Sequence, residues 1–547
     1  MPRRFFGREA ELDRIGSFAK APGSGFLMVR GRRRIGKSWL LTEFGQKTEA
    51  FYFQGDDDSS SRSLMRDMAR AWESYSGDDA LSIIRIVDLS WRRVFDAMTR
   101  FCEENLDRQH VLIFDEIQWI AKQKSGFLGQ LKEAWVHFEK AGNVKIIICG
   151  SSQRFFAQAT ASETSVLHRL RTVADLWIEP FSLSETRRHY FPRWTEEQVC
   201  LVFMMTGGVP YYLERIPRSG NFIRAINKAF FTKETIFLDE FREVLNLEFT
   251  KGSARTAEAI MECLGQDGST LENIRKKSTI KIESTVRSMV DQLVTFQIVG
   301  EKTRAGDRKA NRRGSKFYLK DPFLNFYFQV LRKRTRQIKK NETANLFGEG
   351  LGSKTGYYIE DFSGKAFELL VEWVLEQKLS PPGEEPILKK LDLTEDPFEV
   401  GHHWEEGRTQ VALIVENSGD RESRVLELKW ISNTAGLSAG LSAGLSTGYV
   451  EQVRNKQYSP PKGWTISYYL LLSRPASAPL SEAGHGGEGA GARAGGSLRS
   501  TSRQETANLT TARSFCGFRV CGPRVRRAVA AHARGSPCRP LCTSGRR

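Results

Sequence analysis

The feature that most constrains the fold is a glycine-rich segment, residues 31–38, which reads Gly-Arg-Arg-Arg-Ile-Gly-Lys-Ser. An apolar run at residues 26–30 precedes it and predicts a short buried strand, and helical spacing of apolar residues follows from about Lys37. A loop of the form G-x-x-x-x-G-K-[ST] between a strand and a helix wraps phosphate groups with its backbone N–H groups. The predicted nucleotide-binding residues are Gly31, Arg32, Arg33, Arg34, Ile35, Gly36, Lys37, Ser38 and Trp39.

Two side chains of this loop have separate expected roles. The Lys37 ammonium group is placed to reach the β- and γ-phosphates, and the Ser38 hydroxyl is placed to ligate Mg²⁺. The start of the following helix adds its positive end to the same site. The predicted cofactors are therefore ATP and Mg²⁺.

An acidic pair follows a second apolar run, residues 110–114. An acid at the end of a buried strand is where an ATPase holds Mg²⁺ through water, so Asp115 is the second predicted metal residue. Glu116 is expected to polarise the attacking water. Ser151 closes a third apolar run, residues 144–149, and could sense the γ-phosphate, although an ordinary serine-rich turn fits the pattern nearly as well.

Length and patterning predict several domains in the 547 residues. The expected fold class is α/β, because short apolar runs alternate with long helical stretches. The final segment contains 13 arginines, no lysine, three glutamates and no aspartate, and this abrupt change of composition suggests a disordered, foreign or out-of-frame end. The predicted parts are a phosphate-loop ATPase core with a parallel sheet (1–181), a helical lid (182–250), a winged helix-turn-helix (251–331), a small α/β domain (345–473) and an Arg/Gly/Ala-rich tail (474–547).

Other classes of protein are disfavoured by composition. No apolar run reaches the roughly 18 residues of a membrane span, and the start of the chain lacks the apolar stretch of a secretory signal. Four cysteines are scattered singly, as in cytoplasmic proteins with reduced thiols. The other four, Cys516, Cys521, Cys538 and Cys542, lie in the tail without a helix or strand pattern that would present zinc ligands. We therefore expect a cytoplasmic protein without a membrane partner.

Five short motifs together resemble a known family. They are Phe6–Leu12, the phosphate loop, Asp115–Gln118, Gly150–Ser152 and Gly207–Pro210, and their order is similar to that of archaeal and bacterial AAA+/STAND-type P-loop ATPases. The resemblance covers about residues 3–472. It implies an ATP-hydrolysing molecular switch in which Arg169 or Arg171 acts on the nucleotide, and a nucleotide-dependent oligomer is compatible with it.

The expected winged helix carries basic residues between its two strands. Residues 302–316 contain one acid, Asp307, and seven cations: Lys302, Arg304, Arg308, Lys309, Arg312, Arg313 and Lys316. Beside a recognition helix at about 282–293, this wing suits contacts with the phosphates of double-stranded DNA. A winged helix that packs within the molecule is the alternative.

The small α/β domain resembles restriction-type nucleases with a PD-(D/E)xK core. Glu427 and Lys429 match that pattern, and Glu368 is a candidate helix acid. The aspartate that would complete the metal site is expected where the chain has Ala412, and a methyl group cannot bind Mg²⁺. We predict a nuclease-like fold without nuclease activity, and an exposed Glu427–Lys429 pair is the alternative. His402 and His403 are expected to be an ordinary surface pair.

Two further functions use the same residues. One is a DNA-binding regulator or nuclease whose ATPase is vestigial, which the intact Lys37, Ser38, Asp115 and Glu116 argue against. The other is a kinase for a small acceptor, for which no acceptor-pocket signature is present.

Overall fold

The computed structural model describes residues 7–78, 81, 88–121, 125–161, 173–264, 268–303, 314–340, 347, 357–377, 398–403, 411–417, 421–429, 465–472, 510–511 and 519–522. Contacts divide the chain into two compact units. The first comprises Met1–Glu301 and Lys316–Ala366, and the second comprises Lys302–Ser315 and Phe367–Arg547. None of the helices in the described part of the chain has the length and apolar character needed to cross a lipid bilayer.

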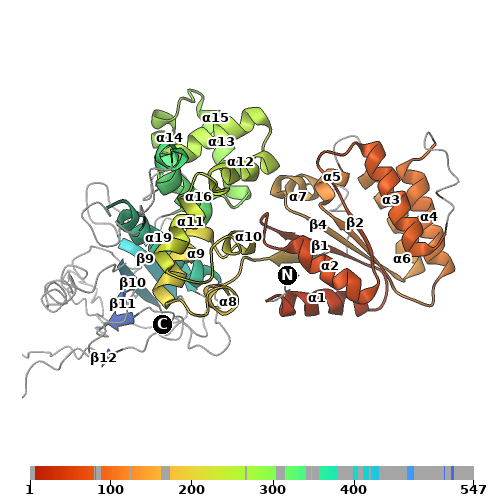
Figure 1. The fold of residues 1–547 in the computed structure, drawn as a ribbon, viewed down its shortest axis with the longest axis horizontal. Coiled ribbons are helices and arrows are strands. Elements are labelled where there is room, and N and C mark those ends of the chain that lie inside the picture. The colour runs from red at the N-terminus through yellow and green to blue at the C-terminus, as the bar shows by residue number, and fades with distance from the viewer. Residues whose placement is uncertain are drawn as a thin grey trace, which may run out of the picture. The chain divides into compact units, whose positions relative to one another are not determined.

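The first unit begins with a parallel sheet, as the sequence predicts (Figure 1). Its five strands have the order β2-β3-β4-β1-β5. Every residue of the two central strands β3 and β4 is buried. Such strands are covered on both faces, which explains their continuous apolar sequence. The strands are β1 (Gly25–Gly31), β2 (Phe51–Gln54), β3 (His110–Asp115), β4 (Val144–Gly150) and β5 (Val173–Ile178).

Helices cover both faces of this sheet. Aromatic side chains of α3, α4 and α6, among them Trp72, Phe95 and Phe127, form one core with alternate residues of the strands. On the other face α2 packs so closely that a Cβ added at Gly45 would lie 3.5 Å from Ile113 Cδ1. The helices of this part are α1 (Glu9–Lys20), α2 (Lys37–Thr48), α3 (Ser61–Ser76), α4 (Trp91–Glu104), α5 (Ile117–Ile120), α6 (Phe127–Ala141) and α7 (Gln153–Thr160).

A helical segment follows the sheet, where the sequence predicts a lid. Two of its helices begin with capping boxes, in which Ser182 pairs with Glu185 and Thr195 pairs with Gln198. These caps satisfy N–H groups that the first turn of a helix leaves unpaired, so they fix where the helices start. The helices are α8 (Leu183–His189), α9 (Glu196–Thr206), α10 (Pro210–Leu213), α11 (Phe222–Phe230) and α12 (Phe237–Glu248).

Three helices and two strands come next, in the order expected for a winged helix. They are α13 (Lys251–Cys263), α14 (Leu271–Lys277), α15 (Glu283–Thr295), β6 (Val299–Lys302) and β7 (Lys316–Leu319). Most of the residues between the two strands, including Arg304, Arg308, Lys309, Arg312 and Arg313, lie outside the described residues. The chain continues into α16 (Pro322–Phe326), a π-helical turn (Tyr327–Leu331), a 3-10 turn (Arg332–Arg334) and α17 (Thr335–Lys339).

The second unit contains a mixed sheet of order β12-β13-β11-β10-β9-β8. β10 is parallel to β11 and antiparallel to β9. The elements are α19 (Tyr357–Gln377), which crosses from the first unit, and β8 (Phe398–His403), β9 (Val411–Asn417), β10 (Glu422–Lys429), β11 (Thr465–Leu472), β12 (Thr510–Thr511) and β13 (Arg519–Gly522). The last two strands lie in the tail for which the sequence indicates no regular element, and the rest of the tail lies outside the described residues.

Two sequence interpretations in this unit need correction. Lys302 is not a solvent-exposed wing cation: its side chain is 8% exposed, and its Nζ lies 3.7 Å from Glu372 Oε2. His402 is not a surface residue without an acid partner, because it is buried and its Nε2 lies 2.8 Å from Glu372 Oε1. Sequence patterns missed both contacts because α19 is far from either residue along the chain.

Candidate nucleotide-binding site

The phosphate loop connects β1 to α2, as predicted. Gly31 ends the strand, and a Cβ added there would lie 2.5 Å from the Ile178 carbonyl oxygen, so the tight packing of β1 against β5 requires glycine. Gly36 caps α2 in the left-handed region, with φ of 92°. A Cβ added at Gly36 would meet nothing within 4 Å, so the described protein atoms leave this side of the loop open. Such a glycine lets a ligand approach the backbone at the positive end of a helix.

Lys37 lies inside the loop and is only 4% exposed. Its Nζ donates to the Gly31 carbonyl oxygen at 3.1 Å, to the Arg32 carbonyl oxygen at 3.0 Å and to Ser151 Oγ at 3.0 Å. The lysine therefore joins the loop after β1 to the loop after β4. Its charge is held at the place where the phosphates of a nucleotide are expected.

The acidic pair stands at the end of β3. Asp115 is fully buried, and its Oδ1 accepts the Glu116 N–H at 2.8 Å. Glu116 adopts a left-handed conformation with φ of 48°, which is strained for a residue with a side chain. The bend turns the chain sharply between the strand and α5. Consequently two successive carboxylates are presented at one edge of the sheet.

Ser151 connects the lysine to the glutamate. While accepting from Lys37, it donates to Glu116 Oε1 at 3.1 Å, and the Gln118 side-chain amide donates to Glu116 Oε2. Sheet order explains the contact, since β4 lies between β1 and β3 and its carboxyl end therefore lies between theirs. The structure brings together Lys37, Ser151, Glu116 and Asp115, which the sequence assigns to one site.

The donor set suits the predicted metal. Ser38 follows Lys37 in the first turn of α2, and Asp115 offers a carboxylate from β3. A hydroxyl and a carboxylate are hard oxygen donors, which Mg²⁺ prefers. Ser38 and Asp115 would hold this ion beside the phosphates.

The three loop arginines direct their side chains away from the loop. Arg32 Nε lies 2.5 Å from Asp321 Oδ2, Arg34 Nε lies 2.7 Å from Glu240 Oε1, and Arg33 lies 3.6 Å from Glu243. Burial by itself would lower the pKa of Arg32, but the Asp321 carboxylate raises it overall, so this guanidinium stays charged. The sequence assigns these arginines to nucleotide binding, whereas the structure shows their side chains in ion pairs with α12 and with the start of α16.

A buried glutamate of α12 contacts the segment after β4. Glu248 accepts hydrogen bonds from Ser152 Oγ at 3.2 Å, from the Gln153 N–H at 2.9 Å and from the Arg154 N–H at 2.8 Å. It thus places a carboxylate at the start of α7, where the helix dipole favours negative charge. Burial raises the pKa of Glu248, although the N–H groups of Arg154 and Gln153 oppose the rise.

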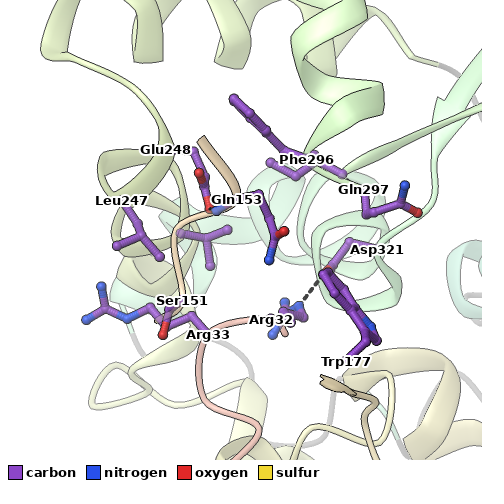
Figure 2. Close-up of a pocket in the computed structure, with 12 residues that line it drawn as sticks. Arg32, Arg33, Ser151, Gln153, Trp177, Leu247, Glu248, Phe296, Gln297 and Asp321 are labelled. Carbon is purple, nitrogen blue, oxygen red and sulfur yellow. Dashed lines mark hydrogen bonds and ion pairs between the residues drawn. The ribbon is translucent and has the colours of Figure 1, made fainter. Parts of the chain in front are cut away.

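A pocket lies beside these contacts (Figure 2). Figure 2 shows Arg32 bonded to Asp321 on one side and Glu248 near Gln153 on another. The residues that line it are Arg32, Arg33, Ser151, Gln153, Trp177, Val244, Leu247, Glu248, Phe296, Gln297, Ile298 and Asp321. The pocket therefore adjoins both the phosphate loop and the serine that contacts Lys37.

Sequence reasoning missed several residues of this site. Tyr52, Glu240 and Glu248 lie far along the chain from their partners, and no motif marks them. Asp321 begins a motif, residues 321–326, that resembles the start of the family's C-terminal part, but the motif does not indicate a contact with Arg32. The arginines at 169 and 171 lie outside the described residues.

Comparison with known proteins agrees with this geometry. Residues 5–216 match the model of a family described as an ATPase domain predominantly from Archaea. An uncharacterised protein of Methanocaldococcus jannaschii is 22% identical over 431 residues, which cover 78% of this chain and 87% of that protein.

Two solved structures show a remote likeness. The Walker-type ATPase of Pyrococcus abyssi has a TM-score of 0.46 at 18% identity, covering 60% of this chain and 96% of that one. The Aeropyrum pernix Orc1 protein in complex with DNA has a TM-score of 0.29 at 14% identity, covering 61% of this chain and 95% of that one. TM-scores of this size establish no shared function. Residues 5–216 are therefore similar in sequence to an ATPase domain family and contain a phosphate loop between a buried strand and a helix.

Proposed function

We propose that the protein is an ATP-hydrolysing molecular switch that passes the state of its nucleotide from the phosphate site to helix α12. The observation that carries the proposal is a pair of adjacent serines. Ser151 bonds Lys37 and Glu116, and Ser152 bonds Glu248 of α12. A shift of this segment when the γ-phosphate is bound or released would act on α12 directly.

The residues of the site have distinct roles in hydrolysis. Lys37 neutralises the β- and γ-phosphates, and Glu116 accepts the proton of the attacking water. Mg²⁺ held by Ser38 and Asp115 would stabilise the charge that develops on the phosphate oxygens. Because Ser151 donates to the same Glu116 carboxylate, it also fixes the orientation of the base.

The acidic side of α12 contacts both nucleotide loops. Glu240 and Glu243 pair with Arg34 and Arg33 of the phosphate loop, while Glu248 caps α7. Glu243 and Glu248 follow Glu240 by three and eight residues, and both spacings keep a side chain on the same side of the helix as Glu240. We propose that phosphate charge entering the loop competes with these carboxylates for the arginines and thereby changes how α12 is held.

ATP turnover and limited proteolysis test the switch together. The intact protein should hydrolyse ATP and give different tryptic patterns with ATP, with ADP and without nucleotide. Lys37→Ala should lose nucleotide binding and all of these differences. Glu248→Ala should still bind ATP but should lose the differences between patterns. Nucleotide-independent patterns in a wild-type protein that does hydrolyse ATP would refute the switch.

Double-stranded DNA is a second proposed partner. Arg275, Lys277 and Lys281 are exposed at the end of α14 and just before α15, and they have no ion pair among the described residues. Three neighbouring cations on a helix-turn-helix suit phosphate contacts that do not read sequence. We place the duplex against this surface. Measuring ATP turnover with and without duplex DNA tests whether the partner acts on the switch.

The remaining assignments are also proposals. Arg169 or Arg171 acts on the nucleotide, the protein forms a nucleotide-dependent oligomer, and its location is cytoplasmic. Within the second unit, we propose a nuclease-like domain that has no nuclease activity.

A further inference from the structure

Tyr52 of β2 contacts the buried acid of the nucleotide site. Its hydroxyl donates to Asp115 Oδ2 at 2.7 Å. The contact follows from the sheet, since β2 runs parallel to β3 and Gln54 pairs with Asp115, which places Tyr52 two residues earlier on the adjacent strand. No motif of the sequence includes this tyrosine.

Two hydrogen bonds hold the Asp115 carboxylate. The Tyr52 hydroxyl donates to Oδ2, and the Glu116 N–H donates to Oδ1. An ionised carboxylate has about four acceptor sites, so about two remain, which is enough for a metal-bound water. Each carboxylate oxygen is therefore held by one donor and can still accept another.

We infer that Tyr52 is a positioning residue for Mg²⁺: its hydrogen bond sets the orientation of the Asp115 carboxylate. The inference rests on the proposed ATPase function and adds a residue to its metal site. Partners of metal-holding side chains commonly contribute a factor of about 10 to 100 to metal affinity. The effect of Tyr52 should therefore appear in the dependence on Mg²⁺ and not in nucleotide affinity without metal.

The test measures binding of a fluorescent ATP analogue to the full chain, first in EDTA and then during Mg²⁺ titration. Tyr52→Phe should bind the analogue in EDTA as the wild type does, and should need about 10 to 100 times more Mg²⁺ to reach half of the metal-dependent change. Asp115→Asn should remove the metal-dependent change.

A matched control is Tyr75→Phe, which removes a half-buried hydroxyl whose contact is His110 Nδ1 at 3.3 Å. It should leave the Mg²⁺ midpoint at the wild-type value, and thermal unfolding checks that each variant is folded. An unchanged midpoint in folded Tyr52→Phe overturns the inference and leaves the ATPase proposal intact. A wild-type protein that binds no nucleotide with or without Mg²⁺ overturns the proposed function instead.

Discussion

At the residue scale, the buried ammonium group of Lys37 is the feature that favours an anionic ligand at this site. Its three hydrogen-bond partners are neutral oxygens, and no carboxylate lies within ion-pair distance among the described residues. A buried ammonium group is costly unless it is paired with an opposite charge. The phosphates of a nucleotide bound at the open side of Gly36 would supply that charge and stabilise the lysine.

The prediction at the scale of single residues concerns the role of Glu116 in ATP turnover. Glu116→Gln should leave ATP affinity near the wild-type value and lower turnover by about 10² to 10⁴-fold, because a glutamine cannot accept the proton of the attacking water. Single-turnover hydrolysis and equilibrium binding measure the two quantities separately. Glu139→Gln, at an exposed glutamate of α6, is the control and should hydrolyse ATP normally. Wild-type turnover by Glu116→Gln would exclude it as the base.

Helix α12 is the element that connects the ATPase core to the following helices of the first unit. Its carboxylates pair with arginines of the phosphate loop and occupy the start of α7. An anion at a helix start is stabilised by the dipole and by N–H groups that lack helical partners. Glu248 therefore fixes α7 as well as α12.

Glu248 should make stability depend on pH in a definite direction. Burial raises its folded-state pKa above the ordinary 4.5, so the folded protein binds this proton more tightly than the unfolded chain. Its contribution then makes the free energy of unfolding rise as the pH falls from the raised pKa toward 4.5. Glu248→Gln removes this contribution. Urea unfolding at about pH 7 and near pH 4.5 measures the free energy of unfolding of both proteins. On going to the lower pH, the wild type should gain stability relative to Glu248→Gln. A wild type that instead loses stability relative to the variant contradicts the raised pKa of Glu248.

The exposed cations of α14 and of the turn before α15 lead to a prediction about the binding of duplex DNA. Changing Arg275, Lys277 and Lys281 to glutamine should weaken binding to all duplex sequences. It should also flatten the slope of log K against log salt by about 0.9 for each DNA phosphate that the variant no longer neutralises. Changing exposed Lys20, Lys140 and Lys228 to glutamine removes the same charge from other helices and should leave the slope unaltered. Equal slopes for the two triple variants would exclude a duplex site at α14–α15.

At the scale of the whole molecule, we propose ATP hydrolysis for the first unit and a nuclease-like architecture for the second. In the second unit Leu426 of β10 pairs with Leu413 of β9, so Glu427 and Ala412 are the next residues along the two strands. Ala412 of β9 therefore lies next to Glu427 of β10 in the sheet. The resemblance to restriction-type nucleases implies an aspartate at the position of Ala412. One missing carboxylate leaves a divalent cation with too few anionic oxygens.

The full chain should not cut DNA. Plasmid incubated with purified protein and Mg²⁺ or Mn²⁺ should stay supercoiled for as long as a buffer control does. Glu427→Ala serves to identify contamination, because any nicking that persists in this variant does not come from the predicted site. Nicking by wild type that disappears in Glu427→Ala would show that the domain is an active nuclease.

The sequence by itself determined the parts of this protein that depend on local patterns. The phosphate loop between β1 and α2, the buried strands β3 and β4 and the succession of α13, α14 and α15 all follow from the spacing of apolar residues and glycines. Asp115 and Glu116 could be placed at the end of a buried strand because they directly follow an apolar run.

Only the tertiary structure decided which distant residues meet. Sheet order places β4 between β1 and β3, and this brings Ser151 into contact with both Lys37 and Glu116. Helix α12 packs so that Glu243 and Glu240 form ion pairs with Arg33 and Arg34 of the phosphate loop. Pairing of β2 with β3 brings the Tyr52 hydroxyl to Asp115. These contacts join residues tens to hundreds of positions apart, and their free energy comes from burial and charge pairing that no local pattern encodes.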